Sequence, residues 1–247
     1  MCGVSLPPKP RRPIPPHNPT LRDLVSGKRQ WSSRPKIEDA KQGFRGWHER
    51  GYLPHRDEPG LTQFVTFHLT DSFPESRRSE WEHFAKIEDE REKRKLIEAY
   101  LDRGRGESHL RQRDFAKLVQ DNFLLFSGEC CGSQNLAPEQ ALRYELRAWV
   151  VMPNHVHVLF KVGAVSMAEI VGAWKKNTGR LANKLLGKRG AFWAEDYFDT
   201  YMRDAEHERK TIRYIENNPT KTKLVLDPKD WPWSSARFRD EFDVLRL

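Results

Sequence analysis

The stretch Met152-Pro153-Asn154-His155-Val156-His157-Val158-Leu159-Phe160 decides the predicted fold of this 247-residue chain, because it reads as a turn followed by a β-strand. Side chains alternate between the two faces of a strand, so His155 and His157 point the same way. The run 146–151 before the turn predicts the partner strand of a hairpin. Two imidazoles about 6–7 Å apart on one face could share a divalent cation. The same pattern also fits a half-exposed hairpin with two solvated histidines.

Composition narrows the class of protein. The chain has 43 Lys and Arg against 35 Asp and Glu, a net charge of +8, which suggests a polyanionic partner, although net charge alone speaks to solubility and non-specific binding. Its three cysteines have no CxxC spacing, so neither a disulfide framework nor a zinc site is expected. No apolar run of about 18 residues or signal-peptide pattern occurs. We therefore expect a soluble, cytoplasmic protein without a membrane partner.

Three regions follow from the composition along the chain. Residues 1–43 are predicted to be a basic, proline-rich arm, which would either lie along a phosphate backbone or serve as a soluble tail. Residues 44–236 are predicted to form the folded domain, with a charge-rich helical insert at about 75–140. Residues 237–247 are predicted to be a C-terminal tail.

The order of the elements predicts the fold class. A strand at 63–69, helices in the insert, the hairpin, a helix, a strand-like segment and a last helix indicate an α+β protein. Its antiparallel sheet would have split βαβ (ferredoxin-like) topology with helices packed on it. The helices are expected at about 79–100, 109–127, 166–186 and 204–217, the strand-like segment at 192–202, and the last helix must end near Pro219.

The helix at 166–186 has three distinct features. Ser166 with Glu169 three residues on is a capping-box pattern at its start. Ile170, Trp174, Leu181 and Leu185 are its expected buried seam. Lys176, Arg180 and Lys184 recur every fourth residue on another face, beside Lys175, and form a positive stripe.

The last helix carries two residues of interest one turn apart, Tyr214 and Asn218. An amide oxygen suits magnesium or manganese. A tyrosine beside two histidines and one amide oxygen is placed to attack a metal-bound phosphate. Tyr197 and Tyr201 are the rival nucleophiles, but neither has a ligand-type residue one helical turn away.

The strand-like segment also contains three acidic residues, Glu195, Asp196 and Asp199. They could be further metal ligands, but we expect them to be solvated carboxylates at a strand edge.

The motifs, taken in order, resemble those of the REP-associated tyrosine transposases, members of the single-tyrosine HUH transposase superfamily. The resemblance covers about residues 44–236. It is carried by the motifs GWHERGYLPH, QFVTFHL, MPNHVHVLF, WKKN, FWAEDYFDTYMRD, YIENNP and DWPWSS.

The resemblance implies a mechanism and its residues. His155 and His157 match the HUH pair, Asn218 matches the third metal-binding position, and Tyr214 matches the nucleophile. The implied cofactor is Mg²⁺ or Mn²⁺. The tyrosine oxygen would attack phosphorus, giving a 5′-phosphotyrosine link and a free 3′-hydroxyl, and the retained bond energy would allow transfer to another strand. The general base stays unnamed.

The resemblance also implies the partner. The family substrate is single-stranded DNA folded into REP-type hairpins, which fits Lys175, Lys176, Arg180 and Lys184 as DNA-binding residues, though each could be an ordinary solvated charge. The protein would act as a monomer or homodimer, associated with the nucleoid of a bacterial cell.

Two alternatives stay open. One is a non-catalytic DNA-hairpin binding protein derived from a transposase. The other is a different phosphodiester enzyme with paired histidines.

Overall fold

The central sheet has four strands in the order β4-β5-β3-β6, and each strand is antiparallel to its neighbours. Along the chain these are β3 (Thr62–His68), β4 (Tyr144–Val151), β5 (His155–Val162) and β6 (Phe198–Tyr201). The β4–β5 hairpin is thus inserted so that β5 lies between β3 and β4. This arrangement is the split βαβ topology, and the predicted α+β fold with an antiparallel sheet is confirmed.

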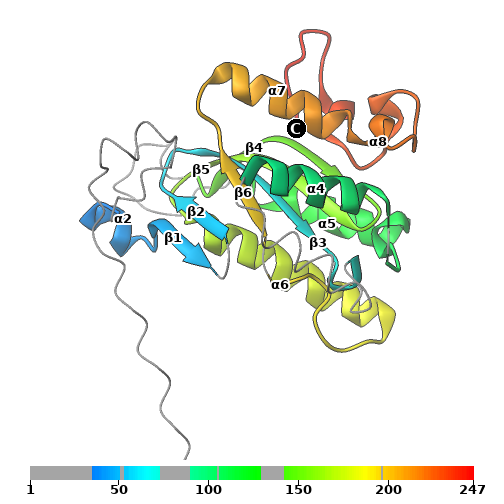
Figure 1. Ribbon diagram of the computed structural model, residues 1–247, viewed down its shortest axis with the longest axis horizontal. Coiled ribbons are helices and arrows are strands. Elements are labelled where there is room, and N and C mark those ends of the chain that lie inside the picture. The colour runs from blue at the N-terminus through cyan, green and yellow to red at the C-terminus, as the bar shows by residue number, and fades with distance from the viewer. Residues whose placement is uncertain (1–34, 51–52, 73–89, 105, 129–141, 196) are drawn as a thin grey trace, which may run out of the picture. The chain divides into compact units, whose positions relative to one another are not determined.

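The computed structural model describes residues 35–50, 53–72, 90–104, 106–128, 142–195 and 197–247 (Figure 1). Residues 35–247 form one compact unit. The first 34 residues of the predicted arm lie outside the described residues. So do two parts of the predicted insert, 73–89 and 129–141.

Helices cover both faces of the sheet, and Figure 1 shows α6 and α7 on opposite sides of it. On one face, α5 (Arg113–Leu125) and α6 (Met167–Leu186) bury the larger core against the sheet. On the other face, α7 (Ala205–Glu216) packs through Ile215 onto a smaller apolar cluster. Strand residues alternate between the two clusters, as period-2 patterning requires.

Smaller elements complete the described part. Strands β1 and β2 form a separate two-stranded antiparallel sheet. The remaining bounds are α2 (Ile37–Lys41), β1 (Gly46–Arg50), β2 (Leu53–Asp57), η1 (Thr70–Ser72), α4 (Glu90–Asp102), η3 (His109–Arg111), α8 (Asn218–Lys221), η4 (Pro228–Asp230) and η5 (Ser235–Phe238).

Local sequence signals explain how α6 begins and where its buried seam ends. The Ser166 hydroxyl accepts a hydrogen bond from the Glu169 N–H, 3.3 Å away, so the predicted N-cap is confirmed. The expected seam is wrong at Leu185, whose side chain is 60% exposed. Ala182 is the last fully buried residue of the helix, and in the final turn Leu186 stays partly buried against the larger core while Leu185 faces solvent.

The segment expected as a strand at 192–202 forms a strand only at its end, where β6 pairs with β3, although Trp193 makes an isolated antiparallel bridge with Leu69. Phe192 and Trp193 instead bury their rings, and the Trp193 indole donates to Thr178 of α6. The last main helix ends at Glu216, as expected near Pro219. Pro219 then lies in the first turn of α8, where its missing N–H costs no hydrogen bond.

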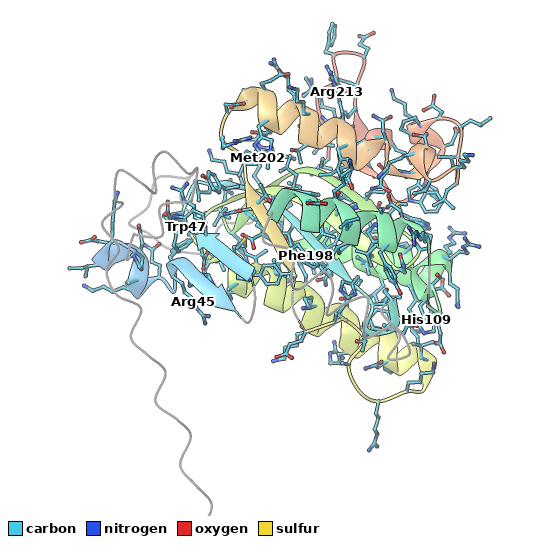
Figure 2. The ribbon with its side chains drawn as sticks, viewed as in Figure 1. Arg45, Trp47, His109, Phe198, Met202 and Arg213 are labelled. Carbon is cyan, nitrogen blue, oxygen red and sulfur yellow. The ribbon has the colours of Figure 1, made fainter. Side chains whose placement is uncertain are left out.

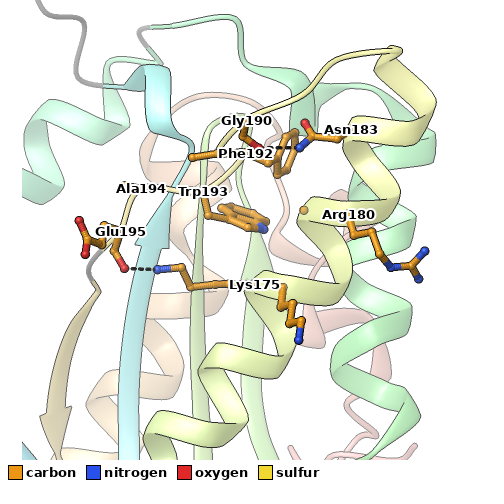
Figure 3. Close-up of a pocket in the computed structure, with 11 residues that line it drawn as sticks. Lys175, Arg180, Asn183, Gly190, Phe192, Trp193, Ala194 and Glu195 are labelled. Atoms are coloured by element: carbon orange, nitrogen blue, oxygen red, sulfur yellow. Dashed lines mark hydrogen bonds between the residues drawn. The ribbon is translucent and has the colours of Figure 1, made fainter.

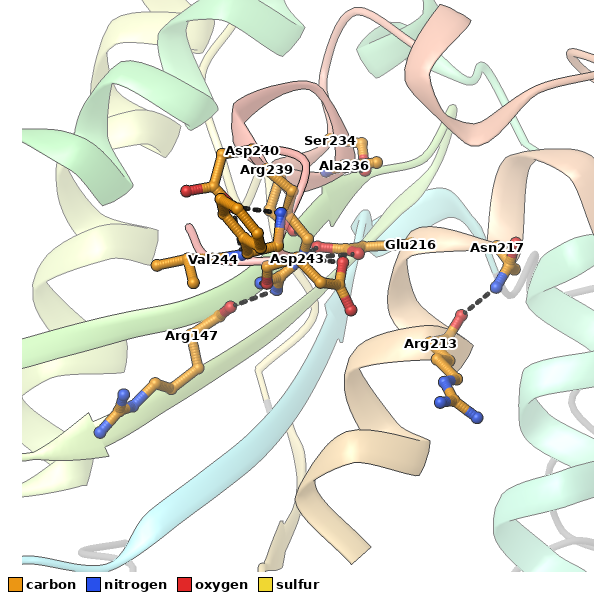
Figure 4. Close-up of polar contacts among 12 residues, drawn as sticks. Arg147, Arg213, Glu216, Asn217, Ser234, Ala236, Arg239, Asp240, Asp243 and Val244 are labelled. Carbon is orange, nitrogen blue, oxygen red and sulfur yellow. Dashed lines mark hydrogen bonds and ion pairs between the residues drawn. The ribbon is translucent and has the colours of Figure 1, made fainter. Parts of the chain in front are cut away.

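A buried ion pair fastens the end of α7 to the C-terminal segment (Figure 4). The Arg239 guanidinium donates to both carboxylate oxygens of Glu216, at 2.7 and 2.9 Å, and to the Arg147 carbonyl. Arg147 is the unpaired residue of a bulge in β4. The Ser235 hydroxyl also donates to Glu216. Burial raises the pKa of Glu216, while Ser235 and Arg239 act in the opposite direction. The network therefore ties the predicted tail to the domain.

We predict that Arg239→Met destabilises the protein by about 3 kcal/mol, because it leaves the Glu216 charge buried without its partner. The Arg246–Asp240 pair is the matched control, since the Arg246 side chain is 70% exposed. Arg246→Met should cost about 0–1 kcal/mol. Urea denaturation monitored by tryptophan fluorescence measures both, and equal midpoint shifts would contradict the prediction.

Candidate functional site

His155 and His157 open β5 and converge on one point. Their Nε2 atoms are 3.1 Å apart, and the two side chains are 1% and 0% exposed. Two ligands that each bind a cation at about 2.1 Å, at a right angle, are about 3 Å apart. The spacing of the two nitrogens therefore fits a shared cation without rearrangement.

Neighbouring groups hold the outer nitrogen of each imidazole. The Asn154 amide donates to the Leu101 carbonyl, so its oxygen, 2.8 Å from His155 Nδ1, is left to accept the proton of that nitrogen. Thr66 Oγ1 lies 2.7 Å from His157 Nδ1. With both Nδ1 atoms protonated, both Nε2 lone pairs face each other, and a cation between them removes their repulsion.

Asn218 supplies a third donor. Its side chain is fully buried, and its Oδ1 has no hydrogen-bond partner among the described residues. Its Nδ2 lies 3.5 Å from the Tyr214 hydroxyl, one helical turn earlier. A buried amide oxygen without a partner is costly, and coordination of a cation would satisfy it. Two imidazoles and this oxygen are thus a chemically suitable donor set for a divalent cation.

Tyr214 lies against the histidine pair. Its ring centroid is 5.6 Å from that of His157 and 6.0 Å from that of Phe64, both in edge-on geometry. Its side chain is half-buried, and the Lys221 ammonium lies 5.5 Å from its ring centroid. The structure thus brings Tyr214, His155, His157 and Asn218 together within a single chain.

Three further polar residues surround this site, and the sequence interpretation missed their connection to it. His68 on β3 pairs directly opposite His155 in the sheet. Asp102, the last residue of α4, has its Oδ1 3.9 Å from His155 Nε2 and its Oδ2 2.7 Å from Lys221 Nζ. Of these three residues, only His68 had a sequence signal, because it alternates with Thr66 and so lies on the same face of its strand.

Burial controls the charge of these histidines. It lowers the pKa of His155 well below the ordinary value, assisted by the charges of His157, His68 and Lys221. It also lowers the pKa of His68, to about 4, while the hydrogen bond to the Leu69 carbonyl opposes the shift. Neutral imidazole is the form that binds a cation.

An open cleft of about 370 Å³ lies between α6 and the segment 190–195 (Figure 3). Three of the four predicted DNA-binding residues, Lys175, Lys176 and Arg180, line it, and Lys184 does not. The Lys175 ammonium donates to the Glu195 carbonyl. The pKa of His68 is lowered mainly by burial, and the charge of Lys175 adds a smaller contribution in the same direction.

The rival nucleophiles lie elsewhere. Tyr197 is buried in the larger core, 5.1 Å from the His55 ring centroid. Tyr201 packs against Trp47 and under the Arg56 guanidinium. Figure 2 shows where Trp47 lies on β1. Neither tyrosine contacts the histidine pair in any described interaction.

The expectation of solvated carboxylates is wrong at Asp199. Its side chain is 3% exposed and is hydrogen bonded to the equally buried His55. The reason is tertiary, because His55 comes from β2, which packs over β6. Glu195 is exposed at the cleft, and Asp196 lies outside the described residues.

We predict that His68 stays neutral on acidification until about pH 4, whereas in the unfolded chain it protonates near 6.5. Between these values the unfolded state binds the extra proton, so this residue lowers stability as the pH falls. Asp57, whose pKa burial raises to about 6, acts in the opposite sense over much of this range. An NMR titration of labelled imidazoles, with the urea-unfolded protein as control, isolates His68. A midpoint near 6.5 in the folded protein would refute the prediction.

No helix in the described part of the chain is long and apolar enough to cross a membrane.

Comparison with known proteins gives three findings. Residues 137–218 match the protein family described as "Transposase IS200 like". A segment of 92 residues is 25% identical to the REP-associated tyrosine transposase of Escherichia coli (strain K12), covering 37% of this chain and 54% of that protein. The chain therefore aligns with about half the length of this curated relative.

A solved structure, described as "Structure of the REP associates tyrosine transposase bound to a REP hairpin", aligns over 81% of this chain and 91% of that one. The identity is 18% and the TM-score 0.42. The predicted resemblance is confirmed by the sequence comparisons: residues 137–218, which match the family described as "Transposase IS200 like", carry both histidines, Tyr214 and Asn218.

Proposed function

We propose that this protein cleaves and transfers single-stranded DNA at REP-type hairpins, with Tyr214 as the nucleophile. The observation that carries the proposal is the contact between the Tyr214 ring and His157, beside a second imidazole and an orphan amide oxygen. A phenol next to a cation site is the arrangement that phosphodiester transfer through a covalent intermediate requires.

His155, His157 and Asn218 would hold Mg²⁺ or Mn²⁺. The bound cation would supply charge stabilisation on the non-bridging oxygens of the scissile phosphate. Asn154 and Thr66 keep the imidazoles in the orientation that this role needs. Burial keeps His155 neutral and available at physiological pH.

Tyr214 then attacks phosphorus through its hydroxyl oxygen. The new bond joins tyrosine oxygen to phosphorus, the bond from phosphorus to the 3′-oxygen breaks, and the released 3′-oxygen takes a proton. The phosphodiester energy is retained in the 5′-phosphotyrosine, so a second 3′-hydroxyl can reverse the reaction and join the strand to a new end. The Lys221 ammonium near the ring favours the phenolate.

The DNA partner follows from the family segment and from the charge of the cleft. The solved relative is described as bound to a REP hairpin, and the cleft along α6 presents Lys176 and Arg180 to solvent. Ammonium and guanidinium groups bind phosphates, and they do so with little regard to sequence. All four site residues come from one chain, so a monomer suffices for cleavage. A bacterial nucleoid is the compartment that fits this substrate.

We predict that the protein forms a covalent adduct with a 5′-flanked, labelled hairpin oligonucleotide in the presence of Mn²⁺. The adduct should disappear in Tyr214→Phe, because only the nucleophilic oxygen is removed. Tyr201→Phe is the matched control and should keep adduct formation. Denaturing gel electrophoresis detects the labelled protein directly.

The outcomes separate the candidate functions. Hairpin binding without an adduct in the unmodified protein would indicate a binding protein that has lost turnover. If the adduct is lost in Tyr201→Phe and retained in Tyr214→Phe, the nucleophile is Tyr201 and the assignment to Tyr214 is wrong. Cleavage to free 5′-phosphate without an adduct would indicate a hydrolytic phosphodiester enzyme.

We also predict that Lys176→Ala and Arg180→Ala each weaken hairpin binding and lower the slope of log affinity against log salt by about one. Lys117→Ala is the control, because Lys117 is an exposed cation on α5 that is already paired with Asp121. Fluorescence anisotropy over a salt series measures the slopes. Slopes equal to that of Lys117→Ala would exclude the cleft as a phosphate-binding surface.

A further inference from the structure

Asp102 is the one carboxylate that the described residues bring to the histidine pair. It ends α4, in the region that the sequence marks as a helical insert without an evident role. Its Oδ1 is shielded from solvent and has no hydrogen-bond partner among the described residues. Its Oδ2 receives a hydrogen bond from Lys221 at 2.7 Å. The carboxylate is therefore held in place by one oxygen, while the other faces His155.

The distances allow Asp102 and the histidines to bind the same ion. Two donors that each bind one cation at about 2.1 Å can be no more than about 4.2 Å apart. Asp102 Oδ1 is 3.9 Å from His155 Nε2, and the two Nε2 atoms are 3.1 Å apart. Both separations are within that limit. In the described residues no three His, Cys, Asp or Glu side chains, these three included, already stand in a metal-binding arrangement, so the Asp102 carboxylate must shift toward the two Nε2 atoms when a cation binds.

Electrostatics points the same way. The hydrogen bond from His155 Nδ1 to Asn154 leaves the Nε2 lone pair facing outward. That lone pair, the second Nε2 and Asp102 Oδ1 then bring three electron-rich atoms to one buried place, although Lys221 neutralises the carboxylate through its other oxygen. Without a positive ion this arrangement is unfavourable, since no described donor satisfies Asp102 Oδ1.

We propose that Asp102 is a fourth ligand of the cation, supplied by the helical insert. This inference rests on the proposed metal-dependent function and extends it. Two imidazoles suit zinc, copper or nickel, whereas an amide oxygen and a carboxylate suit magnesium and manganese, so the charged oxygen of Asp102 would shift the preference further toward the latter pair. Asp102 therefore sets the choice of metal as well as the affinity.

The first test measures metal binding by isothermal titration calorimetry, without DNA. Asp102→Asn should weaken Mn²⁺ binding about tenfold or more and weaken Zn²⁺ binding much less. Glu98→Gln, one turn earlier on α4, makes the same charge change and should alter the Mn²⁺ affinity less than about threefold. Lys221→Met keeps the carboxylate but removes its ion pair, so it should leave Mn²⁺ binding unchanged or strengthen it.

The second test detects direct coordination. In Asp102→Cys, Co²⁺ should produce a thiolate-to-metal charge-transfer band that is absent from the unmodified protein. The band should vanish when His155→Ala is added. The unmodified protein controls for the three natural cysteines.

The results distinguish this inference from the function on which it rests. Mn²⁺ binding that requires His155 and is unaffected by Asp102→Asn would refute the fourth ligand and leave the proposed function intact. Equal losses of Mn²⁺ affinity in Asp102→Asn and Glu98→Gln would show that Asp102 acts only through its charge and does not coordinate the ion. Mn²⁺ binding that persists unchanged in His155→Ala would refute both.

Discussion

The pairing of β3 with β5 is the constraint on which the site depends. Its register places His68 opposite His155 and Thr66 opposite His157, so all four polar side chains share one face. A slip of one residue would move them to the other face. The register is fixed by the intervening apolar residues, such as Phe67 and Val158, which are fully buried beneath α5 and α6. Burial of the larger core therefore positions the histidines on the opposite face.

The second half of the site depends on where α7 ends. Ile215 is fully buried in the smaller core, which directs the neighbouring Tyr214 toward Phe64 and His157. Glu216, the next residue, is held by Arg239, so the last turn of the helix is fixed from both sides. Asn218 then begins α8, and the break between the helices keeps its amide within reach of the phenol. The contacts of Ile215, Glu216 and Asn218 together determine the direction in which the Tyr214 side chain points.

Much of the candidate site could be predicted from the sequence, because it depends on the short repeat periods of strands and helices. Alternation in a strand predicts that His155 and His157 share a face, and the spacing of one helical turn predicts that Tyr214 and Asn218 share a face. The structure brings these four residues together, as the two periods predict. Tertiary contacts could not be read in this way. Asp199 is buried because His55 arrives from 144 positions away. Asp102 reaches the site only through the packing of α4, whose sequence is charged around most of its surface.

The charged groups around the site neutralise each other in pairs, and a bound cation would change this pairing at Lys221. Asp102 and Lys221 neutralise each other, and the His155 imidazole beside them has its pKa lowered by burial, which keeps it uncharged. If the carboxylate turns its charge toward a cation, the Lys221 ammonium loses part of its partner while it remains close to the Tyr214 ring. A less neutralised ammonium stabilises a phenolate more strongly. Occupation of the proposed cation site would thereby strengthen the field of the Lys221 ammonium at the Tyr214 ring, whose centroid is 5.5 Å away.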